Sequence, residues 1–245
     1  MRTIDFPDLL FSKTIVRTPR ILQLSYAGIA DRRSIALAYV CGAGCAALVA
    51  ALLLEQTAIA AAAKLVASSA FVMMAISAGA LASRFGLLIL AGLVLSWFGD
   101  AFLIGTARHW FLLGLASFLL AHIAYAAAFL TIGIDRRWTL GAALPVAVIA
   151  GAVLLWLQPY LPQELVWPVR LYTAVISLMV VTAFGTLGAG ATPLIVSGAC
   201  LFFLSDLSVA ALRFTEPAFP TYVFGLPLYY AAQICLAFSI AARAR

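Results

Sequence analysis

Long apolar runs, separated by short polar breaks, dominate the chain after residue 33. The runs are continuous and lack the alternation that is typical of a membrane β-strand. A helix of ~20 apolar residues can cross a lipid bilayer, and helices satisfy their own backbone hydrogen bonds inside lipid. The pattern therefore predicts an all-α polytopic membrane protein with eight transmembrane helices, at about 34–54, 57–82, 85–105, 110–131, 138–157, 165–188, 191–213 and 219–242.

The polar breaks between these runs are too short to hold a second domain. Residues 34–242 are therefore expected to form a single membrane domain, with pseudo-halves at 34–131 and 138–242. The preceding segment, 1–33, is basic and charged throughout. It is expected either to lie on the membrane surface as an amphipathic segment or to be a disordered tail.

Composition indicates that lipid is the main solvent. The chain is 65% hydrophobic and 10% charged, whereas a soluble domain carries roughly 25% charged residues. The net charge of +6 does not indicate a nucleic-acid partner, because the basic residues mostly occupy short loops between apolar runs. Membrane lipids are the expected surroundings, and the sequence leaves the oligomeric state open.

The distribution of basic residues predicts the orientation in the membrane. Lysine and arginine are enriched in cytoplasmic loops. If the N-terminus is cytoplasmic, only Arg108 and Arg213 lie outside, and Lys64 and Arg170 fall within spans. All other basic residues are then cytoplasmic, so both termini are expected on that side. The excess of arginine over lysine and the many alanines favour a bacterial inner membrane.

Five ionisable side chains fall inside the predicted helices: Lys64, Asp100, His122, Arg170 and Asp206. Such groups are costly in lipid and usually mark a functional site. At about 1.5 Å of rise per residue, all five lie between the middle of the membrane and its outer third. This convergence in depth predicts that they share one site.

A weak internal repeat relates these residues. The two cations are separated by 106 positions, and so are the two aspartates. After a loop insertion of five residues, His122 aligns with Gln233. Four spans per half give both halves the same orientation, which predicts a 4+4 parallel repeat with the site between the halves, as in some transporters.

Two buried carboxylates near two cations permit two interpretations. In the first interpretation, the carboxylates and cations form structural ion pairs, one per half, that hold helices together. Alternatively, they form a general acid–base pair, because low dielectric favours the neutral form of one carboxyl group while a nearby cation keeps the other ionised. The catalytic interpretation is favoured, because both carboxylates, both cations and His122 lie at one depth.

Other catalytic chemistries lack their residues. His109 and His122 are the only histidines, so a three-histidine metal site cannot be built. The four cysteines lie in apolar runs without metal-ligand spacing. A GxSxG elbow is absent, and no Walker or GxGxxG motif has the strand-to-helix context that it needs. Metal chemistry is therefore disfavoured.

Four stretches resemble the YhhN-like family, whose characterised members are lysoplasmalogenases. The order and spacing match over roughly residues 35–242, and one departure is that many members have Lys-Pro in the second span, where this chain has Lys64 followed by Leu65. The stretches that carry the resemblance are GLVLSWFGDAFLI, FLLGLASFLLAHIAYAAAF, SGACLFFLSDLSVAALRF and YYAAQ.

The resemblance implies hydrolysis of the vinyl-ether bond of lysoplasmalogen, a lysophospholipid, to a fatty aldehyde and a glycerophospho-ethanolamine or -choline. This reaction begins with protonation of a carbon and passes through an oxocarbenium ion, as in glycosidases that use two carboxylates. The resemblance therefore implies a reaction that needs no metal or organic cofactor. One of Asp100 and Asp206 is then the acid, the other activates water or stabilises the cation, and His122 relays a proton. Lys64 or Arg170 is expected to hold the lipid phosphate. The other expected substrate contacts are Tyr125, Tyr172, Tyr230 and Gln233.

Three other functions stay open at this point. A small-solute or ion transporter fits a duplicated bundle with charges at mid-membrane depth. A lipid-binding or structural protein fits if the charges only form ion pairs. An intramembrane aspartyl protease also uses two aspartates, but the Pro-Ala-Leu motif is absent. Aldehyde release from lysoplasmalogen distinguishes the hydrolase, and solute flux in liposomes distinguishes the transporter.

Overall fold

The computed structural model of the protein describes residues 32–243. Nearly all of the basic segment 1–33 falls outside these residues, so its location on the membrane surface stays a prediction. Between Arg32 and Arg243 the chain forms eight long helices and no strand, and each helix is long and apolar enough to cross a membrane. The predicted all-α fold with eight spans is therefore confirmed. The helices are α1 (Arg32–Leu53), α2 (Thr57–Ser77), α3 (Arg84–Phe102), α4 (Arg108–Leu130), α5 (Arg136–Leu157), α6 (Val166–Gly188), α7 (Leu194–Phe214) and α8 (Tyr222–Arg243).

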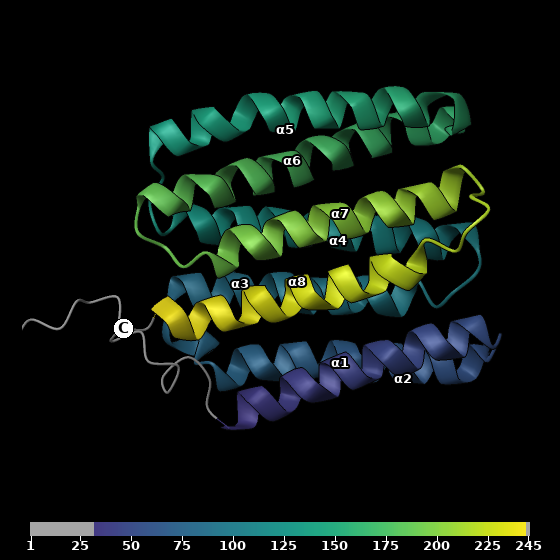
Figure 1. Ribbon diagram of the computed structural model, residues 1–245, viewed down its shortest axis with the longest axis horizontal. Helices are drawn as coiled ribbons and strands as arrows, with labels where there is room; N and C mark the ends of the chain where they lie inside the picture. Colours follow the sequence, from purple (N-terminus) through teal and green to yellow (C-terminus); the bar gives the residue numbers. More distant parts are fainter. Residues whose placement is uncertain (1–31, 244–245) are drawn as a thin grey trace, which may run out of the picture.

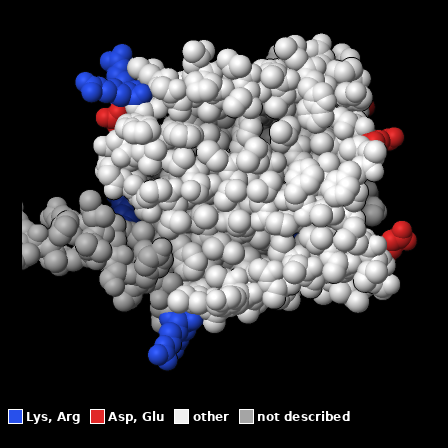
Figure 2. Space-filling view, in the orientation of Figure 1, with Lys and Arg blue, Asp and Glu red and all other residues white. Residues whose placement is uncertain are grey.

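The helices run side by side along one direction (Figure 1). α1 begins and α8 ends at the same end of the bundle, which we call the terminal end; the opposite end is the distal end. On the face shown in Figure 2, most lysine and arginine side chains lie at the terminal end, and the middle is almost wholly neutral. This arrangement suits a bundle whose middle lies in lipid, whereas the cytoplasmic assignment of the terminal end stays a prediction.

The packing places α8 near the centre of one half of the bundle. α8 contacts α1, α2, α3 and α7, and the main core cluster draws buried side chains from these helices and from α4 and α6. α4 packs on α6 and α8 packs on α2, which are equivalent pairs under the proposed 4+4 scheme. The internal repeat itself stays a prediction. α5 packs mainly on α6 and lies at the edge (Figure 1).

Several helix ends differ by a few residues from the spans expected from hydropathy, and two of these differences have a local cause. The second span was expected to run to residue 82, but α2 ends at Ser77, because Gly79 adopts a left-handed conformation with φ of 86°. Glycine tolerates this conformation and commonly ends helices. α5 begins at Arg136, earlier than expected, because the Asp135 carboxylate accepts hydrogen bonds from the backbone N–H groups of Arg137 and Trp138.

Close packing between α3 and α4 depends on Gly92. A β-carbon at Gly92 would overlap the ring of Tyr125, which is fully buried. Gly92→Ala is therefore expected to displace this ring and to lower the free energy of unfolding by about 1–3 kcal/mol, measured by thermal unfolding in detergent. The control is Gly42→Ala in α1, where an added β-carbon meets no atom within 4 Å. An unfolding temperature of Gly92→Ala equal to that of the control would contradict this account.

Candidate functional site

Asp100, on α3, is buried where α2, α3 and α8 meet; it is 3% exposed. Ser68 Oγ of α2 donates a hydrogen bond to Asp100 Oδ2 at 2.6 Å, and the Tyr229 hydroxyl of α8 donates to the same oxygen at 2.7 Å. Lys64 Nζ, also from α2, lies 3.9 Å from Oδ1. The carboxylate therefore ties three helices together and contacts protein groups through both oxygens.

A further layer of polar side chains lies around this carboxylate. The Tyr230 hydroxyl is 3.3 Å from Ser68 Oγ. The Tyr125 hydroxyl donates to Gln233 Oε1 at 2.9 Å and lies 3.3 Å from Ser96 Oγ. Tyr125, Tyr230 and Gln233 are each at most 1% exposed. These three predicted substrate contacts therefore bind other groups of the protein in this structure.

Asp206, on α7, has a different environment between α4 and α6. The Tyr172 hydroxyl of α6 donates to Asp206 Oδ2 at 2.6 Å. His122 Nε2 of α4 lies 3.1 Å from the same oxygen and 3.0 Å from the Tyr172 hydroxyl. The Asp206 side chain is 18% exposed, whereas the His122 side chain is fully buried. Within the described residues all of these contacts use Oδ2, so Oδ1 is left for a proton or a ligand.

The fully buried ring of Phe202 lies between the partners of the two aspartates. Its centroid is 4.6 Å from that of His122 and 5.3 Å from that of Tyr229. Because His122 contacts Asp206 and Tyr229 contacts Asp100, the ring separates two carboxyl clusters. We call them the Asp100 cluster (Lys64, Ser68, Asp100, Tyr229) and the Asp206 cluster (His122, Tyr172, Asp206). This arrangement differs from the single site expected from depth alone.

Both clusters fall inside a region that matches a known family. The family model described as the YhhN family matches residues 59–240, which extend from α2 to α8. The chain belongs to the YhhN family. No solved structure matches the chain. Membership identifies a YhhN-type membrane protein and is consistent with a hydrolase, and the chemistry has to be argued from the residues.

The two predicted cations have different positions in this YhhN protein. Lys64 pairs with Asp100. Arg170, its counterpart in the proposed repeat, is exposed, and its guanidinium carbon lies 5.4 Å from the centroid of the Trp167 ring. Arg170 therefore lies outside both clusters, and Tyr172 and His122 take the place of a cation beside Asp206. Its role in binding a lipid phosphate stays a prediction.

Sequence reasoning missed two members of the Asp100 cluster. Ser68 follows Lys64 by four positions, and side chains at this spacing lie on the same face of a helix; this signal was present in the sequence. Tyr229 was passed over in favour of its neighbour Tyr230 as a substrate contact. Neighbouring positions on a helix point about 100° apart, and the rotation of α8 that brings Tyr229 onto Asp100 follows from packing against several helices.

Two polar atoms near the clusters are buried and have no hydrogen-bond partner within residues 32–243: His122 Nδ1 and Gln233 Nε2. The same residues hold no group of three or more His, Cys, Asp or Glu side chains arranged for a metal ion. A neutral imidazole donates through one nitrogen and accepts through the other. His122 can therefore exchange a proton with the Asp206–Tyr172 pair through Nε2 without breaking another contact at Nδ1.

Proposed function

We propose that this protein hydrolyses the vinyl-ether bond of a lysophospholipid of the lysoplasmalogen type, and that the reaction takes place at the Asp206 cluster. The observation that carries the proposal is the contrast between the two oxygens of Asp206. Oδ2 is held by Tyr172 and lies beside His122, while Oδ1 of the partly exposed carboxyl group has no partner among residues 32–243. Membership of the YhhN family supports a membrane hydrolase.

The proposed chemistry uses Asp206 first as an acid and then as a base. The neutral carboxyl group transfers its proton from Oδ1 to the β-carbon of the vinyl ether, and the electron pair of the double bond forms the new C–H bond. The ether oxygen stabilises the resulting oxocarbenium ion, which is also the kind of transition state that glycosidases stabilise. Water then adds to the α-carbon, and Asp206 takes up one of its protons. The hemiacetal collapses to a fatty aldehyde and the alcohol of the glycerophospholipid.

His122 and Tyr172 position Asp206 for both steps. The tyrosine hydroxyl at 2.6 Å from Oδ2 fixes the plane of the carboxyl group and stabilises the carboxylate that forms after proton transfer. His122 Nε2 lies within hydrogen-bond reach of both partners, so it can shift a proton between them. Proton transfer by a positioned group contributes typically 10²–10⁴-fold to a rate.

Asp100 has a positioning role in this proposal. Both of its oxygens contact protein groups, and Phe202 separates its partner Tyr229 from His122. The Asp100 cluster therefore positions Tyr229, which packs against Phe202, and Phe202 in turn packs against His122. An Asp100 variant that lost activity with unchanged stability would instead assign Asp100 to the reaction itself.

The test is aldehyde release by the purified protein in detergent from three lysophospholipids that differ only at the first glycerol carbon: vinyl ether, saturated alkyl ether and ester. Only the vinyl ether has a carbon–carbon double bond next to the ether oxygen that can be protonated at carbon, so aldehyde is expected from it alone. Free fatty acid from the ester, without aldehyde from the vinyl ether, would contradict the proposal. Absence of any product together with solute flux in liposomes would favour a transporter.

A further inference from the structure

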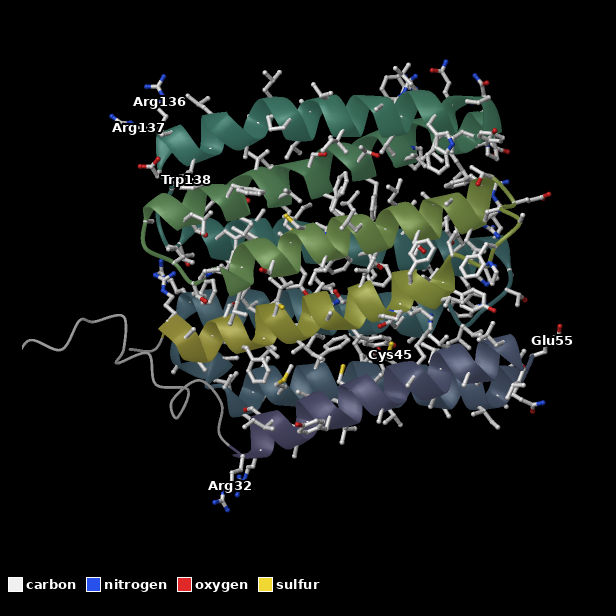
Figure 3. The ribbon with its side chains drawn as sticks, viewed as in Figure 1. Arg32, Cys45, Glu55, Arg136, Arg137 and Trp138 are labelled. Carbon is white, nitrogen blue, oxygen red and sulfur yellow. The ribbon has the colours of Figure 1, made fainter. Side chains whose placement is uncertain are left out.

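An apolar groove of about 700 Å³ opens between α5, α6 and α7. Its lining includes Trp138 and Gly141 of α5, Phe184 of α6, and Phe203 and Leu207 of α7. The lining is apolar except for Arg137 at the terminal end, where Figure 3 labels Arg137 and Trp138 at the start of α5. In a bilayer, a groove of this chemistry is complementary to a hydrocarbon chain.

The groove and the Asp206 cluster share neighbouring positions of α7, although no residue of the cluster lines the groove. Leu207 directly follows Asp206, and Phe203 precedes it by one turn of α7. Along α5 the groove extends from Trp138 to Ile149, a rise of ~16 Å, which is about half of the ~30 Å hydrocarbon thickness of a bilayer. It is therefore about as long as one lipid chain and runs from the level of Asp206 toward the terminal end.

An arginine lies on the other side of Asp206. Arg213 follows Asp206 by seven positions on α7, which is the same helix face about 10 Å closer to the distal end. Its guanidinium is exposed and lies 4.6 Å from the centroid of the Phe111 ring of α4. Stacking of this kind leaves the N–H groups of the guanidinium available to bind an anion.

From the distal end toward the terminal end, α7 thus carries a cation, a carboxyl group and one wall of an apolar groove, and this wall lies about 100° around the helix from the carboxyl group. A lysoplasmalogen carries a phosphate, a vinyl ether and an aliphatic chain in the same order. We propose that the substrate lies along α7, with its phosphate at Arg213, its vinyl ether at Asp206 and its chain in the groove. This inference rests on the proposed function, to which it adds the subsites for the headgroup and the chain.

The chemistry of the substrate selects this orientation over the reverse. In a lysoplasmalogen the vinyl ether is attached to the glycerol next to the phosphate. A phosphate bound at Arg137 would therefore hold the vinyl ether at the terminal end, about the full ~16 Å length of the groove from Asp206. Only a phosphate at the distal end brings the reacting carbon to the Asp206 carboxyl group.

Two glycines of α5 provide a matched pair of variants for the test. Gly141 lines the groove and Gly151 does not, and a β-carbon added at either position meets no atom within 4 Å. Gly141→Phe is expected to fill the groove and to lower kcat/KM for a hexadecenyl substrate by roughly tenfold or more, with little effect on an octenyl substrate. Gly151→Phe is expected to leave both unchanged. Arg213→Gln is expected to raise KM for both chain lengths about tenfold.

Photo-crosslinking tests the orientation independently of the reaction. The probes are saturated alkyl lysophospholipids with a diazirine at the chain end or on the headgroup. The chain-end probe is expected to label α5 near Trp138 and Gly141, less so in Gly141→Phe, and the headgroup probe to label the distal end of α7 near Arg213. Headgroup labelling at Arg137 would overturn the inference, and so would equal chain-length profiles for Gly141→Phe and Gly151→Phe. Correct labelling without aldehyde release would retain the lipid site and reject the proposed reaction.

Discussion

Asp206→Asn is expected to reduce aldehyde release from lysoplasmalogen by on the order of 10²–10⁴-fold, the contribution of a positioned acid or base, without lowering the unfolding temperature. The asparagine oxygen can still accept the hydrogen bond that Tyr172 donates to Oδ2 at 2.6 Å. The packing around His122 and Phe202 is therefore expected to persist. The amide has no acidic proton to transfer to carbon, so kcat is expected to decrease. The measurement is aldehyde release at saturating substrate, with thermal unfolding of the same preparation.

A control must remove an acidic side chain that has no contact with the site. Glu55 is exposed in the turn between α1 and α2 at the distal end, where Figure 3 labels it. Glu55→Gln changes the net charge by the same amount as Asp206→Asn and is expected to leave kcat unchanged. If Asp206→Asn kept more than about a tenth of the wild-type kcat, Asp206 would not be the proton donor.

The length and continuity of the apolar runs were sufficient to predict the helices. Span ends were less certain where a single residue ends or begins a helix, as Gly79 does after α2 and Asp135 before α5. Depth could be predicted as well, because it depends only on the rise per residue. The structure accordingly pairs Lys64 with Asp100 from neighbouring helices.

Rotation about each helix axis could not be predicted in the same way. It depends on how side chains of several helices pack, and all eight helices between Arg32 and Arg243 contribute buried residues to the main core cluster, α5 only through Val146. Arg170 therefore lies within a helix, as expected, but on an exposed face, over Trp167. The position of Phe202 between the two clusters has the same origin. One sequence signal could have added Ser68 to the predicted site: it is a polar residue four positions from the buried charge of Lys64, and therefore on the same helix face.

Asp100→Leu is expected to lower the free energy of unfolding by about 3–5 kcal/mol, the cost of removing one partner from a buried ion pair. The Asp100 and Lys64 side chains are 4% and 16% exposed. Removing the carboxylate leaves the Lys64 ammonium without its counter-charge and two hydroxyl groups, of Ser68 and Tyr229, without their acceptor. The measurement is unfolding in detergent micelles, followed by the loss of helical signal.

A double-mutant cycle isolates the ion pair from the hydroxyl contacts. Lys64→Met in the Asp100→Leu background removes the unpaired cation, so the double variant is expected to be less destabilised than the sum of the single variants, by about 1–3 kcal/mol. The matched control is the pair Arg108–Glu164, whose N–O distance is shorter, 2.9 Å against 3.9 Å, but whose side chains are 59% and 61% exposed. An exposed pair contributes about 0–1 kcal/mol. If the shorter, exposed pair showed the larger coupling energy, burial would not account for the contribution of the Lys64–Asp100 pair to stability. The positioning role of Asp100 would then be rejected.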